Sequence, residues 1–315
     1  MSTESPRSAG SAGSARSARS PQSPRLDVRK TYKLFIGGAF PRSESGRSYE
    51  VTSADGAFLA NAARASRKDA RDAVVAARKA APGWSRATAY NRGQVLYRVA
   101  EMLEGRRAQF VDEVRRGEGG SAADAERQVD AAIDRWVWYA GWSDKLAQVL
   151  GASNPVAGPY FDFSLPEPTG VVAVLAPQRS SLLGLVSVVA PVVVSGNACV
   201  VVASERRPLP AITLAEVLAT SDVPAGVVNV LTGFTAELAP VLAAHMDVNA
   251  LDPTGVLDGQ ADEAGVGLGE LERLAADNVK RVLRPVATDD WYADQGLARL
   301  RAFLETKTVW HPIGV

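Results

Sequence analysis

The middle of the chain alternates short, continuous runs of apolar residues with longer amphipathic stretches. Three apolar runs, at residues 170–175, 198–202 and 227–231, have the length and the Val-rich composition of strands buried on both faces. Helical patterns at residues 211–219 and 236–244 alternate with these runs. This alternation predicts an α/β fold, with a Rossmann-like parallel sheet and flanking helices. Ligands of such folds bind outside the carboxyl ends of the strands.

Upstream of this region the pattern is mainly helical. Residues 33–38 indicate a short strand that runs into a Gly-Gly turn. A capping box of Ser66 and Asp69 opens a helix, and residues 91–114 and 122–149 continue with further amphipathic helices. The last of these stretches carries four aromatic residues: Trp136, Trp138, Tyr139 and Trp142. We interpret this cluster as core or interface rather than as a sugar or cofactor platform.

The two ends of the chain depart from this globular pattern. Residues 1–26 consist mostly of Ser, Ala, Arg, Gly and Pro. We expect a disordered tail there, because such a composition buries too little apolar surface to offset the entropy of ordering. The tail lacks the apolar core of a secretory signal, whereas a transit peptide stays open on composition. Residues 27–286 are predicted to form the globular domain, and residues 287–315 a C-terminal segment with an oligomerisation-type strand arm.

Charge and hydropathy exclude two classes of partner. The chain has 35 basic and 35 acidic side chains, and this zero net charge argues against general binding to nucleic acid or to anionic membranes. The longest apolar run, residues 182–194, is too short to span a bilayer and contains Pro191, which favours a buried helix. We therefore expect no nucleic-acid partner, no membrane and a cytoplasmic location.

The chain has few residues that can bind a metal or act as a nucleophile. Its single cysteine, Cys199, excludes an intrachain disulfide and a Cys-cluster centre, and two histidines argue against a His-based metal site. We predict no metal. Cys199 lies within an apolar strand pattern, so we interpret it as buried and unreactive. We interpret His311 as a structural residue with its hydrogen bonds satisfied, and His245 as a helix-terminal residue that favours the helix dipole.

Several short motifs follow one another in an order that is recognisable. They lie at residues 34–38, 73–79, 84–85, 139–142 (Tyr-Ala-Gly-Trp), 168–172, 196–198, 224–230 and 232–233. No single motif is decisive, but in this order, from residue 33 to about residue 286, the chain resembles the amino-terminal, cofactor-binding half of the aldehyde dehydrogenase superfamily. Residues 303–312 resemble the extreme carboxyl end of some members.

The resemblance implies catalytic groups that this chain does not match. In the family a cysteine thiolate attacks the aldehyde, an asparagine holds the oxyanion and a glutamate activates water. Here Cys199 is the only thiol, Arg179 stands at the asparagine position and Pro285 at the glutamate position. A typical member is roughly half as long again, and the segment that carries its nucleophile has no counterpart here. We therefore assign no catalytic residue.

The family's cofactor site is matched only in part. Four positions keep a residue that the resemblance assigns to NAD or NADP: Glu205, Gly233, Thr254 and Gly255. Val202 replaces the lysine that binds the adenosine ribose, Val256 replaces a serine hydroxyl that holds pyrophosphate, and Thr235 replaces a glycine and would crowd a phosphate. An exposed glutamate after a strand is more often simply solvated, so both interpretations of Glu205 stay open. We expect weak binding of NAD or NADP at most, and no other cofactor.

Three functional hypotheses remain. The first is a pseudoenzyme that serves as a structural or regulatory subunit of a full-length aldehyde dehydrogenase homologue, or that assembles with itself. In the family the C-terminal arm pairs as a β-strand with a neighbouring subunit, so residues 303–315 are the expected contact. The second hypothesis is an NAD(P)-dependent aldehyde oxidoreductase with residual activity. The third is a nucleotide sensor that uses the surviving cleft.

Overall fold

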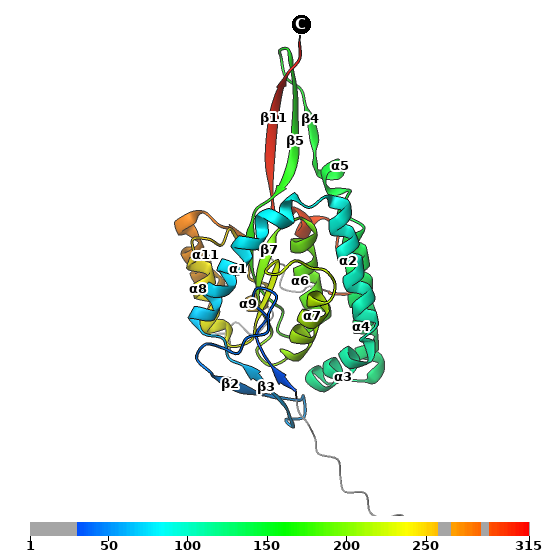
Figure 1. The fold of residues 1–315 in the computed structure, drawn as a ribbon, viewed down its shortest axis with the longest axis vertical. Coiled ribbons are helices and arrows are strands. Elements are labelled where there is room, and N and C mark those ends of the chain that lie inside the picture. The colour runs from blue at the N-terminus through cyan, green and yellow to red at the C-terminus, as the bar shows by residue number, and fades with distance from the viewer. Residues whose placement is uncertain (1–29, 258–265, 285–289, 315) are drawn as a thin grey trace, which may run out of the picture. The chain divides into compact units, whose positions relative to one another are not determined.

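A five-stranded parallel sheet lies at the centre of the part of the chain that the structure describes (Figure 1). The computed structural model describes residues 30–257, 266–284 and 290–314, and Thr31–Val315 form one compact unit. The strand order is β10-β9-β6-β7-β8, and each neighbouring pair is parallel. The strands are β6 (Val171–Leu175), β7 (Ala198–Val202), β8 (Val228–Leu231), β9 (Ala250–Asp252) and β10 (Arg281–Val282). This confirms the predicted α/β class with a Rossmann-like sheet.

Alternate residues of each strand point to opposite faces of this sheet. Different helices cover the two faces. Val171 and Ala173 pack into one cluster, whereas Val172 and Val174 pack into the other. The first face is covered by α1 (Arg67–Arg86), α8 (Thr235–Ala244) and α11 (Leu268–Ala275). The second is covered by α6 (Leu183–Val194) and α7 (Leu209–Ala219). Every residue of β6 and β7 is buried, as their continuous apolar sequence predicts.

A further layer of helices packs outside α6 and α7. It consists of α2 (Ala89–Glu104), α3 (Arg107–Glu118) and α4 (Ala122–Ala140), and the short α5 (Leu146–Leu150) follows α4 along the chain. The predicted capping box is confirmed: the Ser66 side chain accepts from two N–H groups of α1, and Asp69 accepts from the Ser66 N–H. Trp136 and Tyr139 are fully buried and Trp138 is 36% exposed, which agrees with a core position for most of the aromatic cluster.

The sequence predicted a short strand at residues 33–38. This prediction is wrong, because these residues do not pair continuously with a neighbouring strand. The small N-terminal sheet has the order β1-β3-β2, from β1 (Thr31–Tyr32), β2 (Ser48–Thr52) and β3 (Phe58–Ala63). After β1 the chain forms only isolated bridges. In one of them, Phe35 exchanges two backbone hydrogen bonds with Val230 (2.9 and 2.7 Å). Gly37 and Gly38 then adopt positive φ angles of 59° and 81°, so the chain turns before a second strand can form.

A second antiparallel sheet forms an arm, in the order β11-β5-β4. Its strands are β4 (Ala152–Asn154), β5 (Tyr160–Pro168) and β11 (Leu304–Pro312), and β5 and β11 run beyond the amino ends of the central strands (Figure 1). The predicted C-terminal strand is therefore present. However, β11 pairs with β5 of its own chain along its whole length, so only its other edge is left for a neighbouring subunit. The His311 side chain is exposed on β11, and its interpretation as a satisfied structural residue stays a prediction.

The remaining short elements lie next to strands along the chain, and only the last of them leads into the arm. They are α9 (Thr254–Leu257), the 3-10 helix η1 (Ala276–Asn278) and α12 (Ala298–Ala302). The predicted disordered tail at residues 1–26 and the predicted boundary at residues 286–287 lie outside the described residues. Within the described ranges, no helix combines the length and the apolar character that crossing a membrane requires.

Candidate cofactor cleft

The candidate residues follow the carboxyl ends of neighbouring central strands. Glu205 lies after β7, Gly233 after β8, and Thr254 and Gly255 after β9. The parallel order places all of them along one edge of the sheet, as the sequence predicts. They form two groups, because β6 separates β9 from β7.

Glu205 caps a helix instead of being simply solvated. Its carboxylate accepts a hydrogen bond from the backbone N–H of Thr235, the first residue of α8. Its own N–H donates to the side-chain oxygen of Gln178, which follows β6 (2.9 Å). A carboxylate at this place satisfies a free N–H and interacts favourably with the positive end of the helix dipole. The carboxylate therefore occupies a position at which a helix N-terminus would otherwise hold an anion.

Two polar groups near Glu205 are buried without a hydrogen-bond partner: the Thr235 hydroxyl and the Tyr49 hydroxyl. Burial, with a smaller contribution from the Glu205 charge, raises the pKa of Tyr49 well above its usual value. The Tyr49 ring lies 5.6 Å from the ring of Phe234. A cavity of about 690 Å³ adjoins these rings and Glu205, and Arg206 and Arg207 also line it. The cavity is large enough for a small ligand, and it mixes aromatic and charged side chains.

Both candidate glycines have a packing role. Gly233 has a φ of 143°, and a Cβ there would lie 3.1 Å from the backbone nitrogen of Ala65. A Cβ on Gly255 would lie 2.1 Å from the carbonyl oxygen of Ala176. Each position therefore requires glycine because another backbone approaches closely, whether or not a phosphate binds.

Thr254 is held by a buried ion pair that local sequence patterns do not reveal. Its hydroxyl donates to Asp252, the last residue of β9, and accepts from Arg299 of α12 (3.2 Å). Arg299 also forms a salt bridge with Asp252 (2.8 Å), whose side chain is 0% exposed. Asp252 and Arg299 are 47 residues apart in sequence, so no spacing rule joins them.

The structure describes two of the three residues that were compared with the family's catalytic groups, Cys199 and Arg179. Cys199 is fully buried in the middle of β7, and burial raises the pKa of its thiol to about 12, so it is un-ionised at neutral pH, as predicted. Arg179 is exposed, and its carbonyl oxygen accepts from Arg207 (2.6 Å). Pro285 lies outside the described residues.

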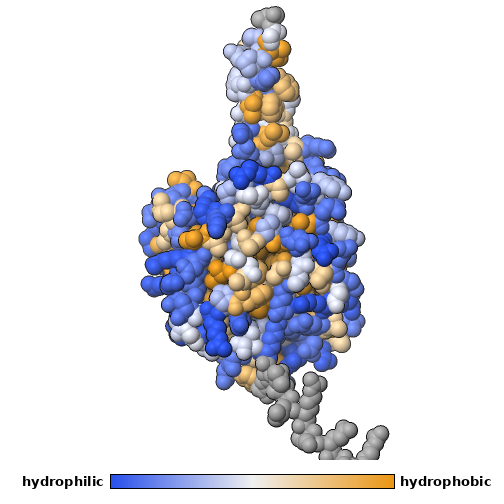
Figure 2. Space-filling view, in the orientation of Figure 1, coloured by the Kyte–Doolittle hydropathy of each residue, from blue (hydrophilic) through white to orange (hydrophobic). Residues whose placement is uncertain are grey.

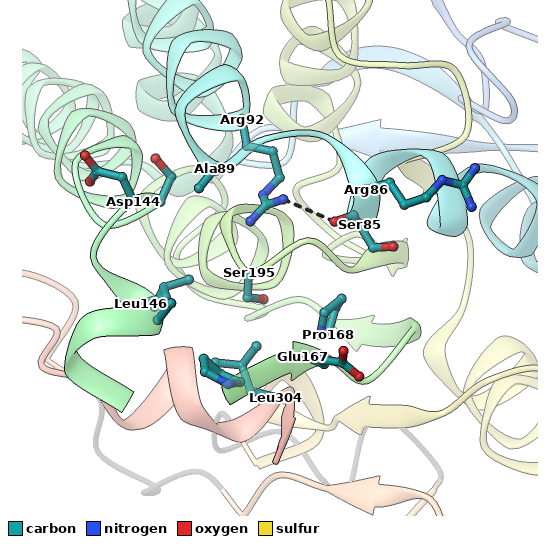
Figure 3. A pocket seen from close by; sticks show the side chains of 13 residues that line it. Ser85, Arg86, Ala89, Arg92, Asp144, Leu146, Glu167, Pro168, Ser195 and Leu304 are labelled. Atoms are coloured by element: carbon teal, nitrogen blue, oxygen red, sulfur yellow. Dashed lines mark hydrogen bonds between the residues drawn. The ribbon is translucent and has the colours of Figure 1, made fainter. Parts of the chain in front are cut away.

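A second cavity, of about 450 Å³, lies at the base of the arm, at the opposite end of the sheet (Figure 3). Arg92 extends from α2 towards Ser85, and its guanidinium donates to the carbonyl oxygens of Ala87 (2.5 Å), Val194 (3.3 Å) and Ser85 (3.4 Å). Burial lowers the pKa of Arg92. The Ser195 hydroxyl donates to the Pro191 carbonyl (2.9 Å). The Arg92 and Ser195 side chains therefore hydrogen-bond to carbonyl groups at the ends of the surrounding helices.

Both histidines lie within the described ranges. There, no group of three or more His, Cys, Asp and Glu side chains is placed to hold a metal ion. His245 ends α8, as predicted. Its Nδ1 accepts from the Asp247 N–H (3.1 Å), and burial lowers its pKa, so the neutral form is favoured. A favourable interaction with the helix dipole needs a charged imidazole, so this interpretation of His245 stays a prediction.

Comparison with known proteins identifies the family. The model of the aldehyde dehydrogenase family matches residues 40–260, and the chain belongs to this family. Retinal dehydrogenase 2 of Gallus gallus is 31% identical over 258 residues, which cover 80% of this chain and 49% of the relative. An aldehyde dehydrogenase of Alternaria alternata is 30% identical, with 79% and 49% covered. The chain thus spans about half the length of these curated relatives.

Solved structures agree with this assignment. HpcC from Thermus thermophilus superposes with a TM-score of 0.72 at 28% identity, covering 80% of this chain and 47% of HpcC. An NAD+ complex of an aldehyde dehydrogenase from Bacillus cereus has the same TM-score at 24% identity, covers 80% of this chain and 50% of its own, and shows the shared fold. The resemblance inferred from the order of short motifs is confirmed.

Proposed function

We propose that this chain is a non-catalytic member of its family that acts as a structural or regulatory subunit. Its partner would be a full-length aldehyde dehydrogenase or a second copy of the chain. Two features support the proposal. The Glu205 carboxylate and the Thr254 hydroxyl of the cofactor cleft are hydrogen-bonded within the chain, and the arm has an unused hydrogen-bonding edge. The second feature carries the proposal, because it points to assembly rather than to chemistry.

The cleft, as the structure describes it, does not fit a dinucleotide. The Glu205 carboxylate takes the first N–H of α8, where a phosphate would otherwise bind. The Thr254 hydroxyl is engaged by Asp252 and Arg299. Valine stands at positions 202 and 256, where the resemblance places a lysine and a serine. A diphosphate would have to displace these internal contacts and would gain few polar contacts in return.

The outer edge of β11 can be identified residue by residue. In an antiparallel pair, hydrogen-bonded and non-hydrogen-bonded residue pairs alternate. The Thr169 N–H donates to the Phe303 carbonyl (3.2 Å), and the Ile313 N–H donates to the Pro159 carbonyl (2.8 Å). Odd-numbered residues of β11 therefore direct their N–H groups to β5, and even-numbered residues direct theirs away from it. Among the described residues no strand pairs with this outer edge.

The arm also exposes large apolar side chains, some of which share one face. Directly opposed residues of paired strands lie on the same face, so Phe163 and its partner Val309 share a face with Phe161 and Leu165. Phe161 is 50% exposed and Leu165 is 39% exposed. Apolar colour follows the arm in Figure 2. An unpaired edge next to exposed apolar side chains is what strand addition by another protein requires.

The test blocks the outer edge and leaves the inner edge intact. Thr308 directs its N–H outward, and its hydroxyl shares a hydrogen bond with Ser164 (2.9 Å). Thr308→Pro removes both the outward N–H and the hydroxyl, whereas Thr308→Ala removes only the hydroxyl and is the matched control. The tagged full chain and both variants are isolated from the native lysate, and native mass spectrometry gives the mass and composition of each complex.

The expected result is a complex that contains a full-length aldehyde dehydrogenase or a second copy, formed by the wild type and by Thr308→Ala but lost in Thr308→Pro. A monomeric wild-type chain would contradict the proposal. So would a complex that Thr308→Pro leaves unchanged. Deletion of residues 303–315 is a poorer test, because Phe303 is fully buried and its loss would damage the core.

The cavity beside Glu205 supports a second candidate function, an NAD(P)-dependent aldehyde oxidoreductase with residual activity. NAD(P) is the cofactor to test, because the chain belongs to the aldehyde dehydrogenase family. Aldehyde-dependent formation of NADH by the pure chain, abolished by Cys199→Ser, would favour this function over the first. Calorimetric binding of NAD or NADP without turnover would favour a nucleotide sensor. The main proposal includes a cytoplasmic location, which cell fractionation tests.

A further inference from the structure

The cavity of about 450 Å³ at the base of the arm contains a guanidinium that is only partly hydrogen-bonded within the chain (Figure 3). Backbone carbonyl groups hold Arg92 in place. Its Nε donates to Val194 (3.3 Å), and its Nη1 donates to Ala87 (2.5 Å) and Ser85 (3.4 Å). These bonds engage Nε and Nη1, whereas Nη2 forms no hydrogen bond to the described residues. The N–H groups of Nη2 are therefore left to donate to a ligand in the cavity.

The charge of Arg92 has no carboxylate partner among the described residues. Burial lowers the pKa of this guanidinium, and no neighbouring carboxylate opposes the shift. The carbonyl groups that it contacts lie at the carboxyl ends of α1 and α6. These helix ends orient the guanidinium, but a helix dipole carries no net charge, so the space around Arg92 stays positive. A partly buried cation without a counter-ion is unfavourable, and an anion that enters the cavity gains a charge-assisted hydrogen bond.

The other charged side chains that line the cavity do not cancel this positive charge. Asp144 forms an ion pair with Lys145 (2.8 Å), and Glu167 forms one with Lys307 (2.9 Å). Arg86, in the last turn of α1, also lines the cavity and has no ion-pair partner within the described ranges. Each acid is thus balanced by a lysine, whereas neither arginine is balanced by a carboxylate. This surplus of positive charge favours an anionic ligand.

Much of the remaining wall is apolar. Leu146 of α5, Pro168 of β5 and Leu304 of β11 surround the space next to the guanidinium (Figure 3). The hydroxyl groups of Ser143 and Ser195 donate to carbonyl groups three or four residues before them (2.9 Å each), so they offer no further donor. One guanidinium nitrogen beside apolar side chains fits a carboxylate with an apolar body. A phosphate, with three strong acceptor oxygens, needs more donors than this wall provides.

We propose that this cavity binds a small organic carboxylate. The charged end of the ligand accepts from Nη2 of Arg92, and its apolar body lies against Leu146, Pro168 and Leu304. A volume of about 450 Å³ is within the range of small-molecule sites. The site lies at the opposite end of the sheet from the cofactor cleft. It does not rest on the proposed function, because the cavity can bind its ligand whether or not the arm assembles with a partner.

The test compares a carboxylate with a neutral molecule of nearly the same shape. Hexanoate, hexanamide and inorganic phosphate are each titrated into the full chain in a calorimeter. Arg92→Met removes the cation and keeps an unbranched side chain. Ala89→Phe places a ring in the cavity and leaves Arg92 unchanged. Arg98→Met is the matched control, because it removes an exposed arginine of the same helix, which pairs with Asp222 (3.2 Å) outside the cavity.

The wild type and Arg98→Met bind hexanoate about tenfold or more tightly than hexanamide, because only the carboxylate forms a charge-assisted hydrogen bond. Arg92→Met lowers the affinity for hexanoate by about tenfold or more and leaves the affinity for hexanamide unchanged. Ala89→Phe abolishes the binding of both, because its ring takes the space of the apolar body.

Several outcomes overturn the proposal. Absence of heat with a large excess of hexanoate does so, and so do equal affinities of the wild type for hexanoate and hexanamide. These two results need no variant, so they stay decisive if Arg92→Met or Ala89→Phe does not fold. Hexanoate binding that both folded variants leave unchanged places the ligand elsewhere. Tighter binding of phosphate than of hexanoate contradicts the ligand class. The subunit proposal is tested separately through the complex that Thr308→Pro disrupts.

Discussion

The cofactor cleft and the arm differ in how far their polar groups are hydrogen-bonded within the chain. In the cleft, Glu205 caps α8, and the Thr254 hydroxyl lies between Asp252 and Arg299. In the arm, the outer edge of β11 is unpaired within the described residues, and Phe161 is half exposed. The cleft thus uses most of its bonding capacity inside the chain, whereas the arm retains such capacity for another molecule. We infer that binding to protein, more than binding to cofactor, distinguishes this family member.

The largest expected effect concerns the buried ion pair between Asp252 and Arg299. Arg299→Met leaves the Asp252 carboxylate buried without its ion-pair partner and should lower the free energy of unfolding by about 3–5 kcal/mol. The double variant Asp252→Asn/Arg299→Gln should lower it far less. Arg281→Met, which breaks an exposed pair, should cost less than about 1 kcal/mol. Urea unfolding of the full chain measures all three. A double variant as unstable as Arg299→Met would show that charge pairing is not what holds this region.

This ion pair also marks the limit of what the sequence could predict. Apolar runs in the sheet face helices on both sides, and their continuous pattern located β6, β7 and β8. Likewise the capping box at Ser66 located the start of α1, because these signals are local. Asp252 and Arg299 meet only through the tertiary fold, and no local pattern connects them.

The errors have physical reasons of the same kind. Residues 33–38 have a strand-like composition, but the positive φ angles of Gly37 and Gly38 turn the chain, and only isolated bridges form there. Glu205 resembled a solvated residue because its hydrogen-bond donor belongs to a helix 30 residues further along the chain. The family resemblance predicted the arm strand but not its pairing with β5.

A smaller effect separates the two roles considered for Glu205. Glu205→Ala removes the side-chain cap of α8 and should lower stability by about 1 kcal/mol, whereas Glu205→Gln keeps an oxygen acceptor and should cost less. Thermal unfolding with and without NAD+ measures both. The account predicts little or no stabilisation by NAD+ in the wild type or in either variant. Clear stabilisation of the wild type that disappears in Glu205→Ala would make Glu205 a cofactor ligand and contradict the comparison.

The smallest effect concerns Glu237, in the first turn of the same helix. Hydrogen bonds from Arg47 and then Arg64 hold the pKa of this carboxyl below its usual value. The folded chain therefore binds this proton more weakly than the unfolded chain. The resulting stabilisation is present above the unfolded pKa and is lost as the pH falls through the folded pKa. Glu237→Gln should cost up to about 1 kcal/mol at pH 7, and the difference should shrink in acid. Urea unfolding at both pH values tests this, and a pH-independent difference would contradict it.

The most direct test of the account is amide hydrogen exchange at single-residue resolution along β11, in the complex isolated from the native lysate. The N–H groups of Lys307 and Val309, directed to β5, should be protected in the free chain and in the complex. Those of Thr306 and Thr308, directed outward, should exchange rapidly in the free chain and become protected in the complex. Rapid exchange of Thr306 and Thr308 in both states would show that no partner strand adds to this edge, and would contradict the proposal that the arm assembles the protein.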